Sequence, residues 1–470
     1  MLRTRLTRCR TFTIGLILAF PLGALPGFPV VAGADRGPSS PDWQAIADQS
    51  LSTLREYVRI DTTNPPADVR PAAAFLERLL KAEGVEVHLF ESSPGHVNLL
   101  ARLEATAPTA SAAAAPRPVL LLHHMDVVPV DRSRWNGDPF SGEISDGFLR
   151  GRGSVDMKSL GVIHVETLLL LKRMGVPRNR EILLLATADE ETGGEAGALW
   201  MIKNHWSDLN PEFVLDEGGF GSRDLIAASG KLVFAVAVAE KRPLWLRVLA
   251  SGTAAHGSQP LPDNAVERVD AALARILAWR DGRTRPRTPA ALRPLLDAVG
   301  PLAENKFTRA IQQDTISLTT FHAGVGDPPK VNVIPSRAEA TLDCRLLPGT
   351  DADLFLSEIR RVAGPEVTVE TIRLAEAASP SSIDTALFEA IRKIIAREDS
   401  EAIVAPLLIP YGTDSNAFRA RGATAYGFLP AEIDASIVAS MHGDAEKFPV
   451  KELGRGVRRL YEILTEFLGY

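Results

Sequence analysis

The chain has 470 residues, of which 45% are apolar and 23% are charged, and its formal net charge is −6. This length exceeds that of one ordinary compact domain, so we expect two domains. The acidic balance excludes the basic surface on which proteins bind nucleic acid or an anionic membrane.

Residues 1–34 have the pattern of a cleaved signal peptide. Four arginines precede an apolar stretch at residues 12–25, which Pro21 interrupts, and a small-residue site ends at Ala34. A membrane anchor is the alternative, but prolines and glycines leave no uninterrupted apolar span of ~20 residues. We therefore expect cleavage after Ala34, a secreted or periplasmic protein, and no membrane contact after cleavage.

Cys344 is the only thiol that remains once a signal peptide containing Cys9 is removed. An intrachain disulfide is then excluded, even in an oxidising compartment. The folded state must be stabilised by its core.

Helical and strand-like patterns alternate from Trp43 onward. Apolar residues recur at helical spacing in 43–60 and 70–83, whereas residues 84–90 alternate like a strand. Continuous apolar runs, typical of interior strands covered on both faces, occupy residues 118–130, 180–190 and 211–219, and a helix is expected at 158–175. This order predicts an α/β domain of three layers, with helices on both faces of the sheet.

A second pattern begins near Leu244. It predicts an α+β unit, an antiparallel sheet backed by two helices, with strands at 243–252, 314–324, 336–349 and 366–374 and helices at 264–280 and 351–364. Residues 376–470 return to α/β character. We therefore predict one domain formed by residues 35–241 and 376–470, and a second domain, residues 242–375, inserted into it.

Several apolar runs end in residues that can bind metal ions. These residues are His123, His124, Asp126, Asp189, Glu190, Glu191, Asp216 and Glu217, and Asp156 and His442 lie in glycine-flanked loops. Each alone is compatible with a turn or a helix cap. Together they would gather at the carboxyl edge of one sheet, where unshielded carboxylates repel. A bound cation pair removes that repulsion, and histidine with carboxylate but no thiolate suits zinc, with cobalt or manganese as substitutes.

At these residues the sequence resembles a known family, the di-zinc amidohydrolases and exopeptidases. Its members include aminoacylase, glutamate carboxypeptidase, acetylornithine deacetylase and succinyl-diaminopimelate desuccinylase. The resemblance covers almost the whole mature chain and rests on ordered motifs: HHMDVVP, GRGSVDMK, ADEETGG, LDEGG, AHGSQP, NVIPSRAEATLDCRLLPG, GTDSNAF and MHGDAEKF. It implies a zinc-binding catalytic domain with an inserted dimerisation or lid domain.

The resemblance implies two Zn²⁺ ions per subunit. One zinc would be held by His124, Asp156 and Asp216, and the other by Asp156, Glu191 and His442. Asp156 would bridge the ions beside a cis peptide bond to Met157. His123 is the alternative to His124, which the His-x-Asp spacing favours.

The resemblance also implies roles in catalysis. Glu190 would be the general base, Asp126 would orient His124, and Asp189 receives no catalytic role. His256 would stabilise the oxyanion in the partner's site of a homodimer formed through the inserted domains.

Substrate binding is implied for four further residues. Asn332 and Arg345 would bind a free carboxylate, although Asn332 could only shape a turn and Arg345 could only cover the sheet. Gly412 and Thr413 would line the pocket.

The implied activity is zinc-dependent hydrolysis of an amide bond next to a free carboxylate, as in a carboxypeptidase. An N-acyl-amino-acid deacylase with little peptidase activity is the alternative. A non-catalytic binding protein should have lost a metal ligand or Glu190, and this chain has lost none of them. A phosphohydrolase should show a phosphate-binding loop or an Asp nucleophile motif, and the sequence contains neither. Dipeptides, N-acyl amino acids and folate-like conjugates stay open as substrates. The run WNGDPFSGEISDGFLRGRGSVDMK favours the carboxypeptidase and long-chain acyl-amino-acid branch.

Overall fold

Two β-sheets organise the computed structural model, which describes residues 40–106, 116–282 and 286–469. The segment expected to be a signal peptide lies outside the described residues. Pro41–Tyr470 forms one unit. Within the described residues, no helix is both long and apolar enough to cross a membrane.

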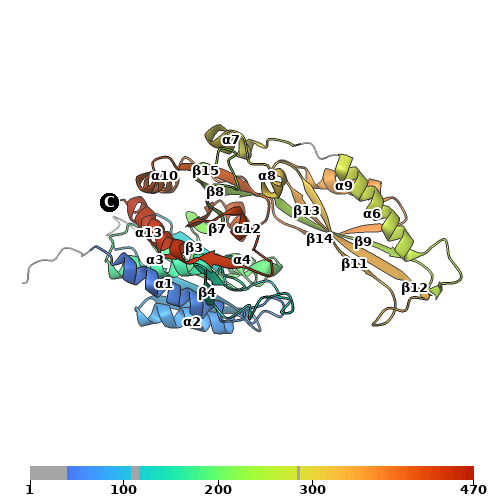
Figure 1. The fold of residues 1–470 in the computed structure, drawn as a ribbon, viewed down its shortest axis with the longest axis horizontal. Coiled ribbons are helices and arrows are strands. Elements are labelled where there is room, and N and C mark those ends of the chain that lie inside the picture. The colour runs from blue at the N-terminus through green and yellow to red at the C-terminus, as the bar shows by residue number, and fades with distance from the viewer. Residues whose placement is uncertain (1–39, 107–115, 283–285, 470) are drawn as a thin grey trace, which may run out of the picture. The chain divides into compact units, whose positions relative to one another are not determined.

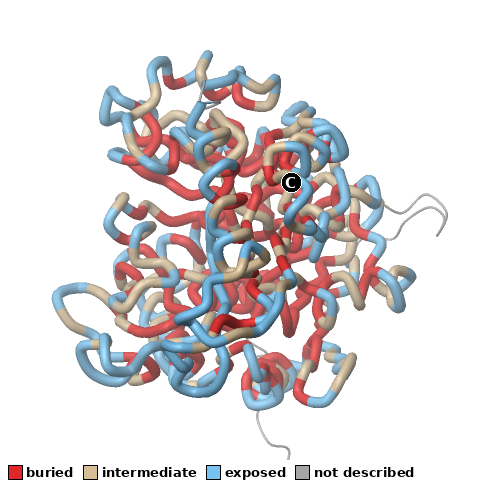
Figure 2. Tube along the Cα trace, turned by 90° about the vertical axis from the view of Figure 1, so that its right-hand side faces the viewer, coloured by how far each residue is buried: buried red, intermediate tan, exposed pale blue. Residues whose placement is uncertain are grey.

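The larger sheet has eight strands in the order β1-β2-β6-β3-β7-β16-β8-β15 (Figure 1). Their bounds are β1 Glu86–Ser93, β2 His96–Leu103, β3 Val119–His124, β6 Ile182–Thr187, β7 Phe213–Ser222, β8 Val233–Glu240, β15 Ile403–Ile409 and β16 Thr424–Glu432. β3 runs parallel to β6 and β7, whereas β1 and β2 are antiparallel. The strands from β2 to β15 are largely buried, whereas the edge strand β1 has no buried residue. Figure 2 shows buried segments concentrated in the interior and exposed segments around them.

Helices cover both faces of this sheet, as the sequence predicts. On β3, Leu121 packs into a core with helices α1 (Trp43–Val58), α2 (Arg70–Ala82), α3 (Lys158–Arg173), α10 (Ala386–Glu398) and α13 (Val450–Phe467). Leu120 and Leu122 pack on the opposite face with α4 (Ala198–Asn204), α5 (Trp206–Leu209) and α11 (Ser415–Ala420). Successive residues of a strand point to opposite faces, so two covered faces require a continuous apolar run.

The second sheet is antiparallel, with the order β11-β13-β9-β14. Its strands are β9 Arg242–Ser251, β11 Thr315–Ala323, β13 Arg337–Leu346 and β14 Thr368–Leu374, and the helices α6 (Ala265–Gly282) and α9 (Ala352–Ala363) pack on it (Figure 1). The α+β arrangement predicted from the sequence is confirmed. α9 starts after Asp351, whose carboxylate accepts the amide N–H of Leu354, and ends at Gly364, where φ is 84°.

Short elements complete the described chain. They are β4 Glu143–Ser145, β5 Phe148–Arg150, β17 Lys447–Pro449, β10 Ala255–His256, β12 Val333–Ile334, α7 Arg293–Val299, α8 Lys306–Ala310, α12 Ala435–Val438 and two 3₁₀ turns, Glu190–Thr192 and Ala290–Leu292. β17 pairs with β5, and β10 pairs with β12.

One segment of the predicted insertion packs elsewhere than the sequence suggests. Leu292, Leu295, Val299, Phe307 and Ile311 belong to the core of the larger sheet and not to that of the second sheet. Residues 290–311 therefore fold against the larger sheet, although they lie within 242–375.

Candidate active site

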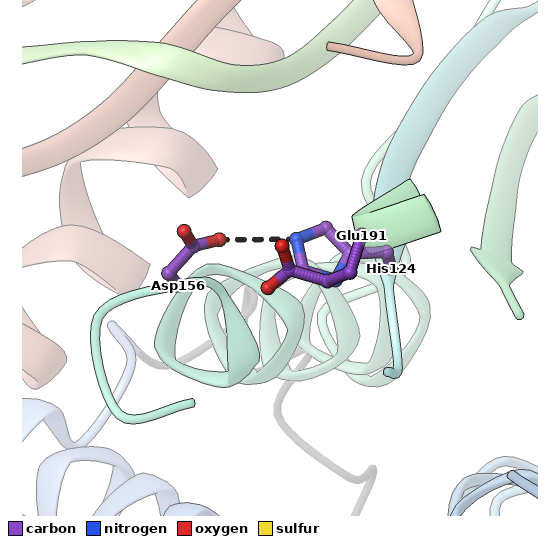
Figure 3. Close-up of side chains that lie close together, drawn as sticks. All are labelled: His124, Asp156 and Glu191. Carbon is purple, nitrogen blue, oxygen red and sulfur yellow. Dashed lines mark hydrogen bonds and ion pairs between the residues drawn. The ribbon is translucent and has the colours of Figure 1, made fainter. Parts of the chain in front are cut away.

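The ends of neighbouring strands bring acids and histidines together. His124 ends β3, and its Nε2 lies 3.1 Å from Oδ1 of Asp156, which precedes α3. Figure 3 shows the His124 ring directed at this carboxylate, with Glu191 beside it. Ligand atoms of these three residues lie within 4.8 Å of one another, so this group could hold a metal ion.

His442 approaches the same carboxylate from the C-terminal part of the chain. Its Nε2 lies 3.1 Å from Oδ2 of Asp156 and 3.3 Å from Oε2 of Glu191. Asp156 therefore lies between two histidines, as a bridging carboxylate would. The peptide bond from Asp156 to Met157 is cis, which confirms that expectation.

The structure places Asp216, one of the expected ligands, against Ser415. Its Oδ2 accepts hydrogen bonds from the amide and the hydroxyl of Ser415, at 3.0 and 2.8 Å. The next residue of β7, Glu217, places Oε1 3.9 Å from Nε2 of His124. The physical reason is the alternation of side chains along a strand, which turns adjacent residues to opposite sides. Glu217, and not Asp216, lies with His124 and Glu190 in a group that could hold a metal ion.

Asp126 links His124 to the turn that carries Glu190 and Glu191. Its backbone carbonyl lies 2.8 Å from Nδ1 of His124, and its Oδ1 lies 3.5 Å from the same nitrogen. Its carboxylate also accepts the amide N–H groups of Glu190 and Glu191, each at 3.2 Å. Asp126 thus fixes the imidazole through its backbone carbonyl and the backbone of the two adjacent glutamates through its buried carboxylate.

Asp189 stabilises that turn and lies apart from the metal-binding groups. Its side chain accepts hydrogen bonds from Asn64, from the Thr192 hydroxyl and from the amide of Ala196. Asn64 also donates to Asp126 at 2.9 Å. Asp189, the first of the three consecutive acids, is therefore stabilised by hydrogen bonds from neutral donors.

His123 points away from these acids. It is fully buried beside Tyr57 and His164. Both of its ring nitrogens lack a hydrogen-bond partner among the described residues. The structure therefore places His124 at the cluster and His123 in the core.

The electrostatics of the cluster favour a bound cation. Burial raises the pKa of Glu190 and of Glu217 well above the usual range, and neighbouring acids add to the shift. Burial opposes protonation of His124, yet its contacts with Asp126 and Asp156 raise its pKa well above the usual value. Oε1 of Glu191 is buried and has no hydrogen-bond partner among the described residues. The site thus offers an excess of carboxylate oxygens that divalent cations would satisfy.

A cavity of about 640 Å³ opens onto the cluster. Glu190, Glu191, Asp156, Glu217 and His442 line it together with the predicted substrate-binding residues Arg345, Gly412 and Thr413. Both oxygens of Asp343 accept hydrogen bonds from the Arg345 guanidinium, at 2.7 and 3.0 Å. The pair presets the orientation of the guanidinium at the cavity wall.

His256 and Asn332 lie away from this cavity. His256 is exposed on β10, where its Nδ1 lies 2.8 Å from the Ser258 hydroxyl. The carbonyl of Asn332 accepts the Gly257 amide at 2.7 Å, beside β12. Neither residue is among those that line the cavity. The structure brings the two residues to each other but not to the cluster of their own chain.

Sequence reasoning missed several residues that shape the site. Glu217 was visible beside Asp216, but the strand face that it occupies was not. Arg152 and Glu446 lie in the motifs GRGSVDMK and MHGDAEKF but received no role, and Asn64 lies in none of the motifs; all three act through contacts that are distant in the sequence.

Comparisons with known proteins agree with this geometry. The profile of peptidase family M20/M25/M40 matches residues 120–466. The chain belongs to this family. Aminoacylase-1 from Sus scrofa is 31% identical over 391 residues, which cover 81% of this chain and 86% of the relative.

Solved structures share the fold. An M20 family metallo-carboxypeptidase, Sso-CP2 from Sulfolobus solfataricus, has a TM-score of 0.68 at 20% identity and covers 90% of this chain and 99% of its own. The YXEP protein of Bacillus subtilis, described as a dinuclear metal binding peptidase, has a TM-score of 0.54 at 14% identity, covering 90% and 98%. The protein is thus a metallopeptidase-family hydrolase with a catalytic sheet and a second, smaller sheet.

Proposed function

We propose that the protein hydrolyses the amide bond of N-acyl amino acids or short peptides that carry a free carboxylate next to that bond. The observation that carries this proposal is the cluster of His124, Asp156, Glu190, Glu191, Glu217 and His442, whose members other than His124 line the cavity. Membership of the peptidase family and the similarity to an aminoacylase support both substrate classes.

We infer that the cluster holds two zinc ions per chain. His124, Asp156 and Glu217 would hold one, and Asp156, Glu191 and His442 the other. Two imidazoles with three carboxylates and no thiolate suit zinc, and cobalt or manganese would substitute. When bound, such a cation pair polarises a carbonyl oxygen and lowers the pKa of water.

Glu190 would act as the general base. Burial gives its carboxylate an elevated pKa, which suits a group that takes a proton from water and returns it to the leaving amine. Its amide is fixed by Asp126, so the carboxylate stays beside His124 and Glu217. Arg345 at the cavity wall would bind the carboxylate of the substrate, and Gly412 and Thr413 would border it.

The cavity wall favours a substrate with an apolar group. Phe220, Trp245, Leu374, Leu429 and Met441 contribute to it. Burying the apolar part of an acyl chain or side chain contributes about 0.8 kcal/mol per methylene. We therefore expect apolar acyl groups or side chains to be preferred over small polar ones.

We also propose a homodimer whose active sites are shared. The exposed His256 and Asn332 lie away from the cavity of their own chain, so a partner's cavity would be their place of action. A twofold dimer through the second sheets would supply both residues to each site. His256 would there stabilise the oxyanion and Asn332 the substrate carboxylate.

We also propose a cellular location, on the N-terminal sequence alone. Residues 1–34 support export and cleavage after Ala34, which would place the enzyme outside the cytoplasm or in a periplasm. The N-terminal sequence of the secreted protein tests this proposal.

A substrate panel tests the proposed activity. N-acyl amino acids with short and long acyl groups, and dipeptides, are supplied with zinc or cobalt, and amine release is measured. Matched substrates whose carboxylate is blocked as an amide form the control. We expect hydrolysis only of substrates with a free carboxylate. Absence of hydrolysis in both classes, or equal rates for blocked substrates, would contradict the proposal.

A further inference from the structure

A buried ion pair joins the two loops that carry Asp156 and His442. Nη1 of Arg152 donates to Oε2 of Glu446 at 2.7 Å, and the two side chains are 2% and 0% exposed. Arg152 lies four residues before Asp156, and Glu446 lies four residues after His442. The pair therefore connects segments that are distant in the sequence but adjacent in the site.

Glu446 fixes the backbone of the loop before α3. Its Oε1 accepts the amides of Val155 and Asp156 at 2.8 and 3.1 Å, and its Oε2 accepts the amide of Gly153 at 3.0 Å. One carboxylate thus accepts hydrogen bonds from three amides of this loop and from a guanidinium. Such charge-assisted hydrogen bonds are stronger and more directional than neutral ones.

Arg152 in turn holds the loop of His442. Its Nη2 donates to the carbonyl of Gly443 at 3.0 Å, and Gly443 follows His442 directly. The His442 side chain is 54% exposed, so packing alone does not fix its position. The buried guanidinium thus holds the backbone directly after His442.

We propose that Arg152 and Glu446 are positioning residues that hold Asp156 and His442 at the spacing needed to bind one divalent cation. The inference rests on the proposed metal-dependent function and assigns these residues no contact with metal or substrate. Partners that orient metal ligands typically contribute 10–100-fold to metal affinity.

Zinc binding to the metal-free protein tests this inference, by competition with a chromophoric chelator. Glu446→Gln keeps the shape of the side chain but replaces one accepting oxygen with an NH₂ group. That group then faces N–H donors of either Arg152 or the loop and cannot accept their hydrogen bonds. We expect one of two zinc ions to bind about 10–100-fold more weakly. The absorption spectrum of the cobalt-loaded variant should also change, because the ligand geometry is altered.

Glu452→Gln is the matched control. Glu452 is also fully buried and paired with an arginine, Arg459, at 2.9 Å, but it accepts the amide of Glu432 and contacts none of the ligands. Both variants should lose thermal stability, whereas only Glu446→Gln should lose zinc affinity. Arg152→Lys is a milder variant that retains the charge but cannot reach Glu446 and Gly443 together. It should lower the affinity for the same zinc ion.

The outcomes are separable when binding is measured well below the unfolding temperature of each variant. Wild-type binding of two zinc ions with unchanged affinity in Glu446→Gln or Arg152→Lys would overturn the positioning role alone. An equal loss in Glu452→Gln would overturn it too, because general destabilisation would explain the effect. A wild-type protein that binds no zinc would contradict the proposed function itself.

Discussion

Glu190 and Glu191 are adjacent in the sequence, but their carboxylates have different neighbours. Glu191 lies against His442, whereas Glu190 lies with His124 and Glu217. The 3₁₀ turn that begins at Glu190 separates their directions, and Asp126 holds both amides. At the scale of single residues, this division allows one acid to bind a cation while its neighbour moves a proton.

The Glu190→Gln variant should fold and still bind two zinc ions. Its turnover should fall by about 10²–10⁴-fold, because the amide cannot accept the proton of the attacking water. Steady-state kinetics and zinc content measured on the same preparation check this prediction. Turnover close to that of the wild type would refute the role of Glu190.

Substitutions in β7 distinguish its two acids. Glu217→Gln should weaken zinc binding by more than about 10-fold, whereas Asp216→Asn should retain both ions and lose about 1–3 kcal/mol of stability with its Ser415 contacts. Zinc competition and thermal unfolding measure the two effects. The reverse pattern would restore Asp216 as the ligand.

The site residues differ in how far their local sequence indicates their role. His124, Asp156, Glu191 and His442 could be found because they follow apolar runs or glycine-flanked motifs. The structure favours Glu217 over the predicted Asp216, a choice that the sequence cannot make because adjacent acids at the end of a run are equivalent until the strand's orientation is known. The sequence gives no sign that Glu446 contacts a loop about 290 residues earlier.

At the scale of elements, the strands follow from the sequence more directly than the packing does. Leu120, Leu121 and Leu122 must face two cores in alternation, so a continuous apolar run predicts a covered strand. The helix α7 and the segment around α8 also carry apolar residues. Their pattern does not specify which core they join, so the sequence does not show that residues 290–311, inside the predicted insertion, pack against the larger sheet.

Arg373, on β14 of the second sheet, contacts the turn that follows Glu190. Nη2 of Arg373 donates to the carbonyl of Gly193 at 2.6 Å. At Gly193 φ is 114°, and an added Cβ would lie 1.4 Å from Nη1 of Arg373. This position requires glycine both for its backbone and for the space that the guanidinium occupies.

Gly193→Ala should lower kcat by about 10–100-fold, because the turn that positions Glu190 must shift. Adding Arg373→Ala should restore part of the loss, since it removes the clash but not the backbone strain. Gly230→Ala is the control: its φ is 70°, and no atom lies within 4 Å of the added Cβ. Wild-type kcat in Gly193→Ala would show that the turn tolerates the change.

At the scale of the whole molecule, the exposed position of His256 makes subunit complementation decisive. His256→Ala and Glu190→Gln should each be inactive as homodimers. After subunit exchange, a mixed dimer would have one site with both lesions and one intact site. We expect such dimers to recover about half the activity of a wild-type dimer, as sharing of sites requires. Mixed dimers that form and stay inactive would exclude action of His256 across the interface.

Titration of the metal-free enzyme tests most directly whether the cluster around Asp156 binds two cations on which hydrolysis depends. Zinc is removed with a chelator, returned in steps, and measured per chain alongside the hydrolysis of an N-acyl amino acid. We expect no activity without metal and full recovery at two equivalents. A metal-free enzyme as active as the zinc-loaded one, or a protein that binds no zinc, would contradict the claim.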